Sequence, residues 1–100
     1  MQLYIKVHKS YRTVVALCDK EILGKKFEEG VKQLDVKETF YNGELIEEDK
    51  VIKELQKQAK EDATFNIVGN NATNIALKAN VIEKDCIGKI ANIPFALKLI

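Results

Sequence analysis

The sequence predicts an α+β fold: one globular domain over residues 1–100, with a mixed β-sheet of about five or six strands, two main helices and an N-terminal β-hairpin. A chain of 100 residues suits one domain. The 46% share of hydrophobic residues and the net charge of +1 exclude a disordered chain. Strand-like stretches fill the first half of the chain and alternate with helix-like stretches in the second, which favours crossover connections onto one sheet.

The N-terminal hairpin is predicted from the alternation of side chains. Residues 2–8 place apolar side chains on one side of an extended chain and polar ones on the other, which is typical of a half-buried strand. A polar break at residues 9–11 leads into residues 13–18, which are apolar on both faces. The second strand should therefore be more central in the sheet than the first.

The next segment is predicted from its punctuating residues. Asp19 is expected to cap a short helical turn that Gly24 ends. Residues 25–30 predict a loop, because Phe27 is the one anchor in a charged stretch. Residues 31–39 predict a further strand with two apolar side chains facing the core.

The middle of the chain holds the strongest local patterns. The Asn42–Gly43 pair between apolar residues predicts a tight turn, since both residue types tolerate a positive φ. Residues 47–60 predict the clearest helix, because acids begin it and an apolar stripe follows at helical spacing. Residues 64–68 predict a short strand.

The last third of the chain predicts a helix and two strands. Asn70 or Asn71 is expected to cap a second helix that runs to about residue 80, with alanines on its packed side. Residues 87–100 predict two short extended pieces divided by Pro94, which belongs at a sheet edge or a break. No repeat, low-complexity segment or linker interrupts the chain.

The two cysteines favour a reduced, cytoplasmic protein with no metal centre and no cofactor. Cys18 and Cys86 are far apart and the only histidine is His8, whereas a structural zinc site needs clustered thiolates or imidazoles. Small secreted domains usually carry several disulfides. No apolar run approaches the roughly 20 residues that span a bilayer, so no membrane segment is expected.

Four parts of the chain carry a family resemblance. They are Lys6–Ser10 with Val14–Asp19, Leu23–Gly30, Phe40–Leu45, and Asn66–Gly69 before an alanine-rich helix. In this order they resemble a small archaeal family, number 424 among the domains of unknown function. The resemblance implies an archaeal cytoplasmic protein of one domain, and it implies no established activity and no functional residues.

One segment departs from the family pattern. Near the C-terminus that pattern reads Gly-Val-Pro-His, where this chain has Asn92-Ile93-Pro94-Phe95. The histidine is therefore missing here, which counts against a catalytic role for the segment.

The first candidate site is the tip and outer face of the predicted hairpin. Cations contact phosphates and aromatic rings stack on unpaired bases, so a surface for single-stranded RNA combines the two. The candidate residues are Tyr4, Lys6, His8, Lys9, Tyr11 and Arg12. The alternative is a solvated strand face with ordinary surface lysines, because a few charges make a weak electrostatic footprint.

The second candidate is an anion-binding turn formed by Gly69, Asn70 and Asn71. Backbone N–H groups at the start of a helix bind phosphates or carboxylates, and glycine permits close approach. The longer glycine-rich stretch of a phosphate-loop enzyme is absent. Plain helix capping is the alternative.

The third candidate is a partner-binding rim that carries Phe27 and Tyr41, each beside charged residues. Two loops with this composition could share one rim and bind another protein. The alternative is that Phe27 and Phe40 plug into the core while the charges are solvated, because aromatic rings contribute most when buried.

Catalysis is poorly supported by the residue content. Nucleophilic catalysis needs a base within reach of the nucleophile, and His8 and Ser10 on one turn do not make a triad. The sequence therefore favours a non-catalytic module of the archaeal cytoplasm that binds RNA or a ribonucleoprotein through the basic hairpin. The alternatives are a protein–protein adaptor that uses the Phe27 and Tyr41 rim, and a small domain that binds a phosphate ligand at the Gly69 turn.

Overall fold

A computed structural model describes residues 1–99 of the chain. Within these residues the main sheet has six strands in the order β5-β1-β2-β6-β8-β7. The strands are β1 (Gln2–His8), β2 (Val14–Asp19), β5 (Glu44–Glu47), β6 (Thr64–Val68), β7 (Ile87–Ile90) and β8 (Ile93–Lys98). Strands β2 and β6 run parallel and the other neighbours antiparallel, so the predicted α+β fold with a mixed sheet is confirmed.

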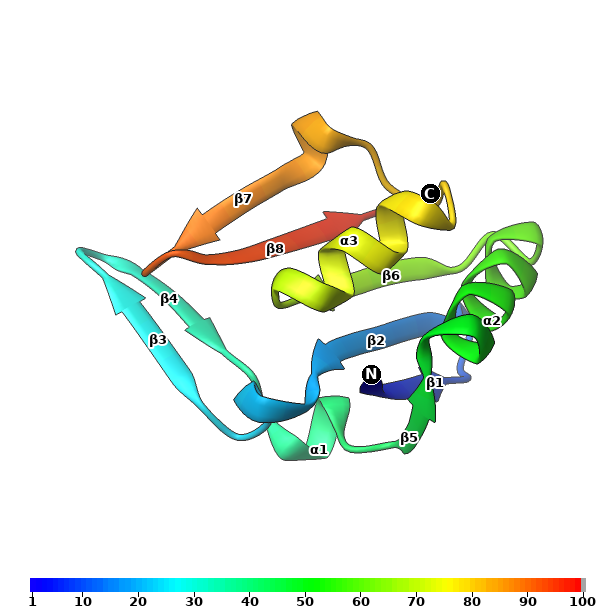
Figure 1. Ribbon diagram of the computed structural model, residues 1–100, viewed down its shortest axis with the longest axis horizontal. Coiled ribbons are helices and arrows are strands. Elements are labelled where there is room, and N and C mark those ends of the chain that lie inside the picture. Colours follow the sequence, from blue (N-terminus) through cyan, green and yellow to red (C-terminus); the bar gives the residue numbers. More distant parts are fainter. Residues whose placement is uncertain (100) are drawn as a thin grey trace.

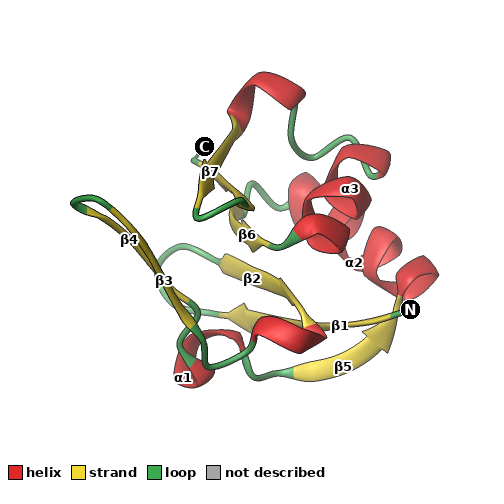
Figure 2. Ribbon diagram, turned by 60° about the vertical axis from the view of Figure 1, so that its left-hand side comes forward, coloured by secondary structure: helices red, strands yellow, loops and turns green. Residues whose placement is uncertain are grey.

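Different elements cover the two faces of this sheet. Helices α2 (Glu48–Lys60) and α3 (Asn70–Lys78) lie on one side (Figure 2). The other side carries a two-stranded sheet of β3 (Lys26–Glu29) and β4 (Lys32–Asp35), together with helix α1 (Glu38–Tyr41). Two 3₁₀ turns, η1 (Lys20–Ile22) and η2 (Lys84–Cys86), complete the described elements.

Because both faces are covered, the sheet has a hydrophobic cluster on each side. In β2, Leu17 packs into the cluster that α2 and α3 close, and its neighbour Cys18 packs into the opposite cluster with Val36. Successive side chains of a strand point to opposite faces, so a strand buried on both sides must be apolar throughout. The prediction that residues 13–18 form a central strand is confirmed, since β2 lies between β1 and β6.

The predictions for residues 25–39 are partly wrong. Residues 26–29, expected in a loop, form β3, and they pair with β4 around a turn at Gly30 and Val31 (Figure 1). The expected strand over residues 31–39 is limited to β4, and α1 follows it. Only Phe27 in β3 and Leu34 in β4 are partly buried, and the other residues of both strands are exposed. The sequence therefore carries no clear alternation over this hairpin.

The Asn42–Gly43 pair connects α1 to β5, and neither residue has the positive φ on which the predicted tight turn depends. Asn42 has a φ of −78° and follows α1, and β5 begins directly after Gly43. A Cβ atom on Gly43 would collide with the backbone carbonyl oxygen of Ile5. Glycine is therefore required here because the chain passes close over β1.

The predicted helices agree with α2 and α3, with one difference at a cap. Helix α2 begins at Glu48, one residue after the predicted start, and α3 ends at Lys78. The N-cap position of α3 is Gly69, with a φ of 115°, rather than either asparagine. The polar group that caps this helix therefore comes from elsewhere in the chain.

Pro94 does not divide the two C-terminal strands, which corrects the prediction. The reversal lies at Ala91 and Asn92, whose φ values are 51° and 66°, and Pro94 lies inside β8. Its carbonyl oxygen accepts a 2.8 Å hydrogen bond from the N–H of Gly69. Pro94 lies opposite Gly69, one residue beyond the last β6–β8 pair, Val68 with Phe95. The missing N–H of the proline therefore removes no hydrogen bond from the β6–β8 ladder.

Candidate nucleic-acid interface

The sheet gathers three distant segments at one end. The last residue of β1 pairs with Val14, Val14 pairs with Thr64, and Phe65 pairs with Lys98. The N–H of Thr64 also donates a 2.9 Å hydrogen bond to the carbonyl of Thr13. The β1–β2 tip, the connection between α2 and β6, and the end of β8 therefore lie together.

The exposed residues at this end include the outermost part of the predicted site. Tyr11 is 101% exposed, so its ring makes almost no contact with the rest of the protein. Lys9 and Arg12 on either side of it are also exposed. Leu97 and Leu99, at 53% and 69% exposure, add apolar surface at the same end.

The other basic residues of the predicted site contact helix α1. The ammonium of Lys6 donates a 2.9 Å hydrogen bond to the carbonyl of Thr39. The Nε2 atom of His8 lies 2.8 Å from the carbonyl of Phe40 and donates to it, since a carbonyl oxygen only accepts. Both groups thus donate to carbonyls in the last turn of α1, which a helix leaves without intrahelical partners.

The aromatic rings on this face of β1 are also packed, which corrects the prediction of an open outer face. The ring of His8 stacks on Phe40 with centroids 4.6 Å apart and an interplanar angle of 16°. Tyr4 packs against the hydrophobic cluster that contains Cys18. The alternation of residues 2–8 in the sequence predicts which side chains share a face of β1. The positions of α1 and the β3–β4 hairpin in the structure show that this face is covered.

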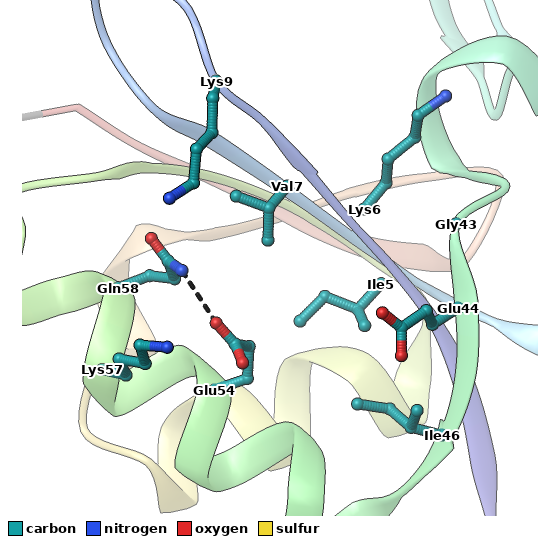
Figure 3. Close-up of a pocket in the computed structure, with 10 residues that line it drawn as sticks. All are labelled: Ile5, Lys6, Val7, Lys9, Gly43, Glu44, Ile46, Glu54, Lys57 and Gln58. Carbon is teal, nitrogen blue, oxygen red and sulfur yellow. Dashed lines mark hydrogen bonds between the residues drawn. The ribbon is translucent and has the colours of Figure 1, made fainter.

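A pocket opens on the other face of β1, between β1, β5 and α2. Its volume is about 410 Å³, and Figure 3 shows its lining. The lining residues are Ile5, Lys6, Val7, Lys9, Gly43, Glu44, Ile46, Glu54, Lys57 and Gln58. Lys9 connects this pocket to the exposed hairpin tip, because it belongs to both.

The residues that α2 contributes to this pocket were missed by sequence reasoning. Gln58 is 6% exposed, and its amide nitrogen donates a 2.7 Å hydrogen bond to Glu54. The sequence does contain one sign of Gln58. This residue lies seven residues after Val51 and three after Leu55, where the apolar stripe of the helix would place another apolar side chain. A buried polar residue at such a position is a departure from the apolar stripe that the sequence alone can show.

The predicted anion site at the start of α3 is occupied by a carboxylate of the protein itself. The Oδ1 atom of Asp19 accepts a 2.7 Å hydrogen bond from the N–H of Ala72, and its Oδ2 atom accepts one of 3.1 Å from Asn71. A Cβ atom on Gly69 would collide with this carboxylate, so glycine makes room for it. Asp19 was predicted to cap η1, but it makes no side-chain cap there and caps α3 instead.

Burial dominates the ionisation of this part of the protein. It raises the pKa of Asp19 above its ordinary value of 3.8, although the N–H groups of Asn71 and Ala72 act in the opposite direction. Burial, together with the adjacent Asp19, raises the pKa of the Cys18 thiol to about 12. Cys18 is therefore a neutral thiol packed in the core, whereas Cys86 is exposed.

The third predicted site is part of the interior. Tyr41 is 6% exposed, and burial raises the pKa of its phenol to about 12. Phe27 is half-buried and packs in the same cluster as Tyr41. The burial of Tyr41 and the packing of Phe27 against the same cluster correct the expectation of a protruding aromatic rim.

No group of three or more histidine, cysteine, aspartate or glutamate side chains within residues 1–99 is placed to hold a metal ion. None of the helices in the same range has the length and apolar character needed to cross a membrane.

The fold and this surface define a small α+β domain with an exposed basic and aromatic tip beside a mixed polar and apolar pocket. Residues 8–99 match the family described as protein of unknown function (DUF424), and the chain belongs to that family. The family resemblance of the sequence is thereby confirmed.

One solved structure is closely similar in fold. It is the crystal structure of an uncharacterized conserved protein from Methanopyrus kandleri, with a TM-score of 0.87, 24% sequence identity, and coverage of 97% of this chain and 90% of that chain. At this identity the likeness shows a shared fold. No curated protein matched the chain.

Proposed function

We propose that this protein is a non-catalytic module of the archaeal cytoplasm that binds single-stranded RNA, free or in a ribonucleoprotein, through the tip of the β1–β2 hairpin. The observation that carries the proposal is the full exposure of Tyr11 between Lys9 and Arg12. A ring without intramolecular packing is available to stack on a base, and flanking cations are suited to the adjoining phosphates. The similarity to a protein from Methanopyrus supports the archaeal assignment.

The sheet geometry extends this surface beyond the hairpin. Lys57 and Lys60 lie on the last turns of α2, and Lys98 lies at the end of β8. The pairings described above place both segments at the same end as Tyr11. Single-stranded RNA crossing the tip would therefore meet further cations on either side, although the chain as a whole carries a net charge of only +1.

The two alternatives from the sequence are not favoured by the geometry. The adaptor hypothesis needs Tyr41 at the surface, and its ring is buried. The phosphate-ligand hypothesis needs unoccupied N–H groups after Gly69, and two of them bind Asp19. The hairpin tip keeps the exposure that its proposed role requires.

Fluorescence anisotropy with a labelled single-stranded RNA of mixed sequence tests the proposal. Replacement of Tyr11 by alanine should weaken binding about 5- to 150-fold, the range expected for loss of one base stack. A Lys9→Ala and Arg12→Ala double variant should weaken binding and lower the slope of log K against log salt by about 1.4, since each phosphate contact on a single strand contributes about 0.7.

The other hairpin provides a matched control. Val31 is 102% exposed at the β3–β4 tip, and Lys32 follows it. Alanine at both positions removes an exposed apolar side chain and a lysine from a hairpin tip and should leave RNA binding unchanged. Equal effects of the two sets of substitutions would refute a site at the β1–β2 tip.

A pull-down of the tagged protein from native extract, split and half treated with ribonuclease, tests the wider claim. Partners that are lost after treatment support RNA as the main ligand. Partners that are retained at full level refute it and favour the protein–protein adaptor.

A further inference from the structure

We propose that the pocket between β1, β5 and α2 is a nucleotide subsite that holds one base with an exocyclic amino group, as in guanine, cytosine or adenine. This inference rests on the proposed function, because Lys9 belongs to both the pocket and the hairpin tip. It adds the chemical class of ligand that the surface selects.

The pocket exists because β5 leaves β1 early. The two strands pair from Gln2 with Glu47 as far as Ile5 with Glu44. Over Lys6–His8, β1 has a partner strand in β2 only, among the residues that the structure describes. Helix α2 crosses beside this free edge, and a hollow of about 410 Å³ remains between them. That size lies within the range of about 300 to 1,000 Å³ that is usual for small-molecule sites.

The floor of the pocket is apolar. The side chains of Ile5, Val7 and Ile46 point into it from β1 and β5 (Figure 3). Branched aliphatic side chains on neighbouring strands make a broad surface that suits one face of a planar ring. The floor therefore accounts for the ring of a base but does not distinguish one base from another.

The walls carry acceptors that would distinguish bases. Because Gln58 donates its amide N–H to Oε2 of Glu54, it orients that carboxylate and keeps its own carbonyl oxygen as an acceptor. Glu44 directs a second carboxylate into the pocket from β5 (Figure 3). Amino groups of guanine, cytosine and adenine donate to such acceptors. Uracil offers one N–H between two carbonyls, which the carboxylates would repel.

The cations lie at one mouth of the pocket. The ammonium groups of Lys9 and Lys57 are directed over the pocket from β1 and α2, whereas that of Lys6 points away toward Thr39 (Figure 3). A nucleotide whose base lies near Glu54 could place its phosphate toward this mouth. The phosphate would then face the hairpin tip, where the rest of an RNA strand is proposed to run.

Titration of the isotope-labelled full chain with the four nucleoside 5′-monophosphates, followed by NMR, tests the subsite. Cytidine, guanosine and adenosine monophosphate should shift the methyl signals of Ile5, Val7 and Ile46, and uridine monophosphate should bind at least about tenfold more weakly. Glu54→Gln should reduce the preference for cytidine over uridine to less than about threefold. Lys57→Ala should weaken all four nucleotides by similar factors.

The controls separate recognition from folding. Glu61, an exposed acid just after α2, is the matched control, and Glu61→Gln should leave both the affinities and the preference unchanged. A loss of preference with retained affinity is a result that mere disruption of the fold would not produce. Equal binding of cytidine and uridine monophosphate by the unsubstituted protein would overturn the inference.

The failure of the subsite and the failure of the proposed function give different results. If no monophosphate shifts the pocket signals at millimolar concentration while RNA still binds through Tyr11, the subsite is refuted and the hairpin function stands. If the monophosphates bind with the expected preference but single-stranded RNA does not bind, the RNA function is refuted and the pocket is a site for free nucleotides. If neither binds, both proposals fall.

Discussion

Removal of the Asp19 carboxylate should destabilise the protein much more than removal of an ordinary surface acid. This side chain is 7% exposed and joins the end of β2 to the start of α3 through hydrogen bonds to the N–H groups of Asn71 and Ala72. Alanine at position 19 leaves both donors without this acceptor, and Ala72 is fully buried. Solvent therefore cannot readily replace the lost partner at that residue.

The magnitude follows from the kind of bond that is lost. Hydrogen bonds to a charged group contribute about 1.5 to 3 kcal/mol each, and loss of an N-cap costs about 0.5 to 2 kcal/mol. The two bonds share one carboxylate, and its desolvation, visible in the raised pKa of Asp19, offsets part of their strength. We therefore expect Asp19→Ala to lower the free energy of unfolding by about 2 to 4 kcal/mol, a large part of the stability of a typical domain.

Equilibrium denaturation in guanidinium chloride at pH 7 measures this effect. Asp49, an exposed acid in the first turn of α2, is the matched control, and Asp49→Ala should cost less than about 1 kcal/mol. Asp19→Asn retains one acceptor oxygen and should fall between the two. If Asp19→Ala were no worse than Asp49→Ala, the reasoning that this carboxylate ties β2 to α3 would be refuted.

Two further predictions concern the same region. Burial raises the pKa of Cys18 from 9.0 to about 12, so the unfolded chain loses this proton at a lower pH than the folded protein does. The contribution of Cys18 to the free energy of unfolding is therefore fully present below about pH 9. It is lost as the pH rises toward 12, by at most about 1.4 kcal/mol per pH unit. Denaturation between pH 8 and 10.5 should show a smaller loss with pH for Cys18→Ala than for the exposed control Cys86→Ala; parallel curves would contradict the burial argument. Gly69→Ala should lower the free energy of unfolding by about 1 to 3 kcal/mol through backbone strain, because residues other than glycine rarely adopt a φ of 115°. The collision of the new Cβ with the Asp19 carboxylate should lower it further. Part of that cost should disappear in the Asp19→Ala background, and strict additivity in this double-mutant cycle would show that the two residues do not collide.

The hairpin site was only half predictable from the sequence. A polar break between two strands indicates an exposed tip, and Lys9, Tyr11 and Arg12 are exposed there as expected. Lys6 and His8 share a side of β1 with surface-type residues, but they bond to carbonyls of α1 more than thirty residues away. Nothing in the local pattern shows that α1 folds back onto that face.

The fold class, the strands of the first hairpin and helix α2 were determined by the sequence alone, because each depends on a periodicity within one segment. An alternating stretch such as residues 2–8 can bury its apolar side chains only as a strand, and the stripe of α2 only as a helix. The covering of the second sheet face, the Asp19 cap of α3 and the pocket beside β1 were decided by the tertiary structure. Each depends on which surfaces meet across thirty to sixty residues of chain, and that choice is made by the packing of the whole domain rather than by any one segment.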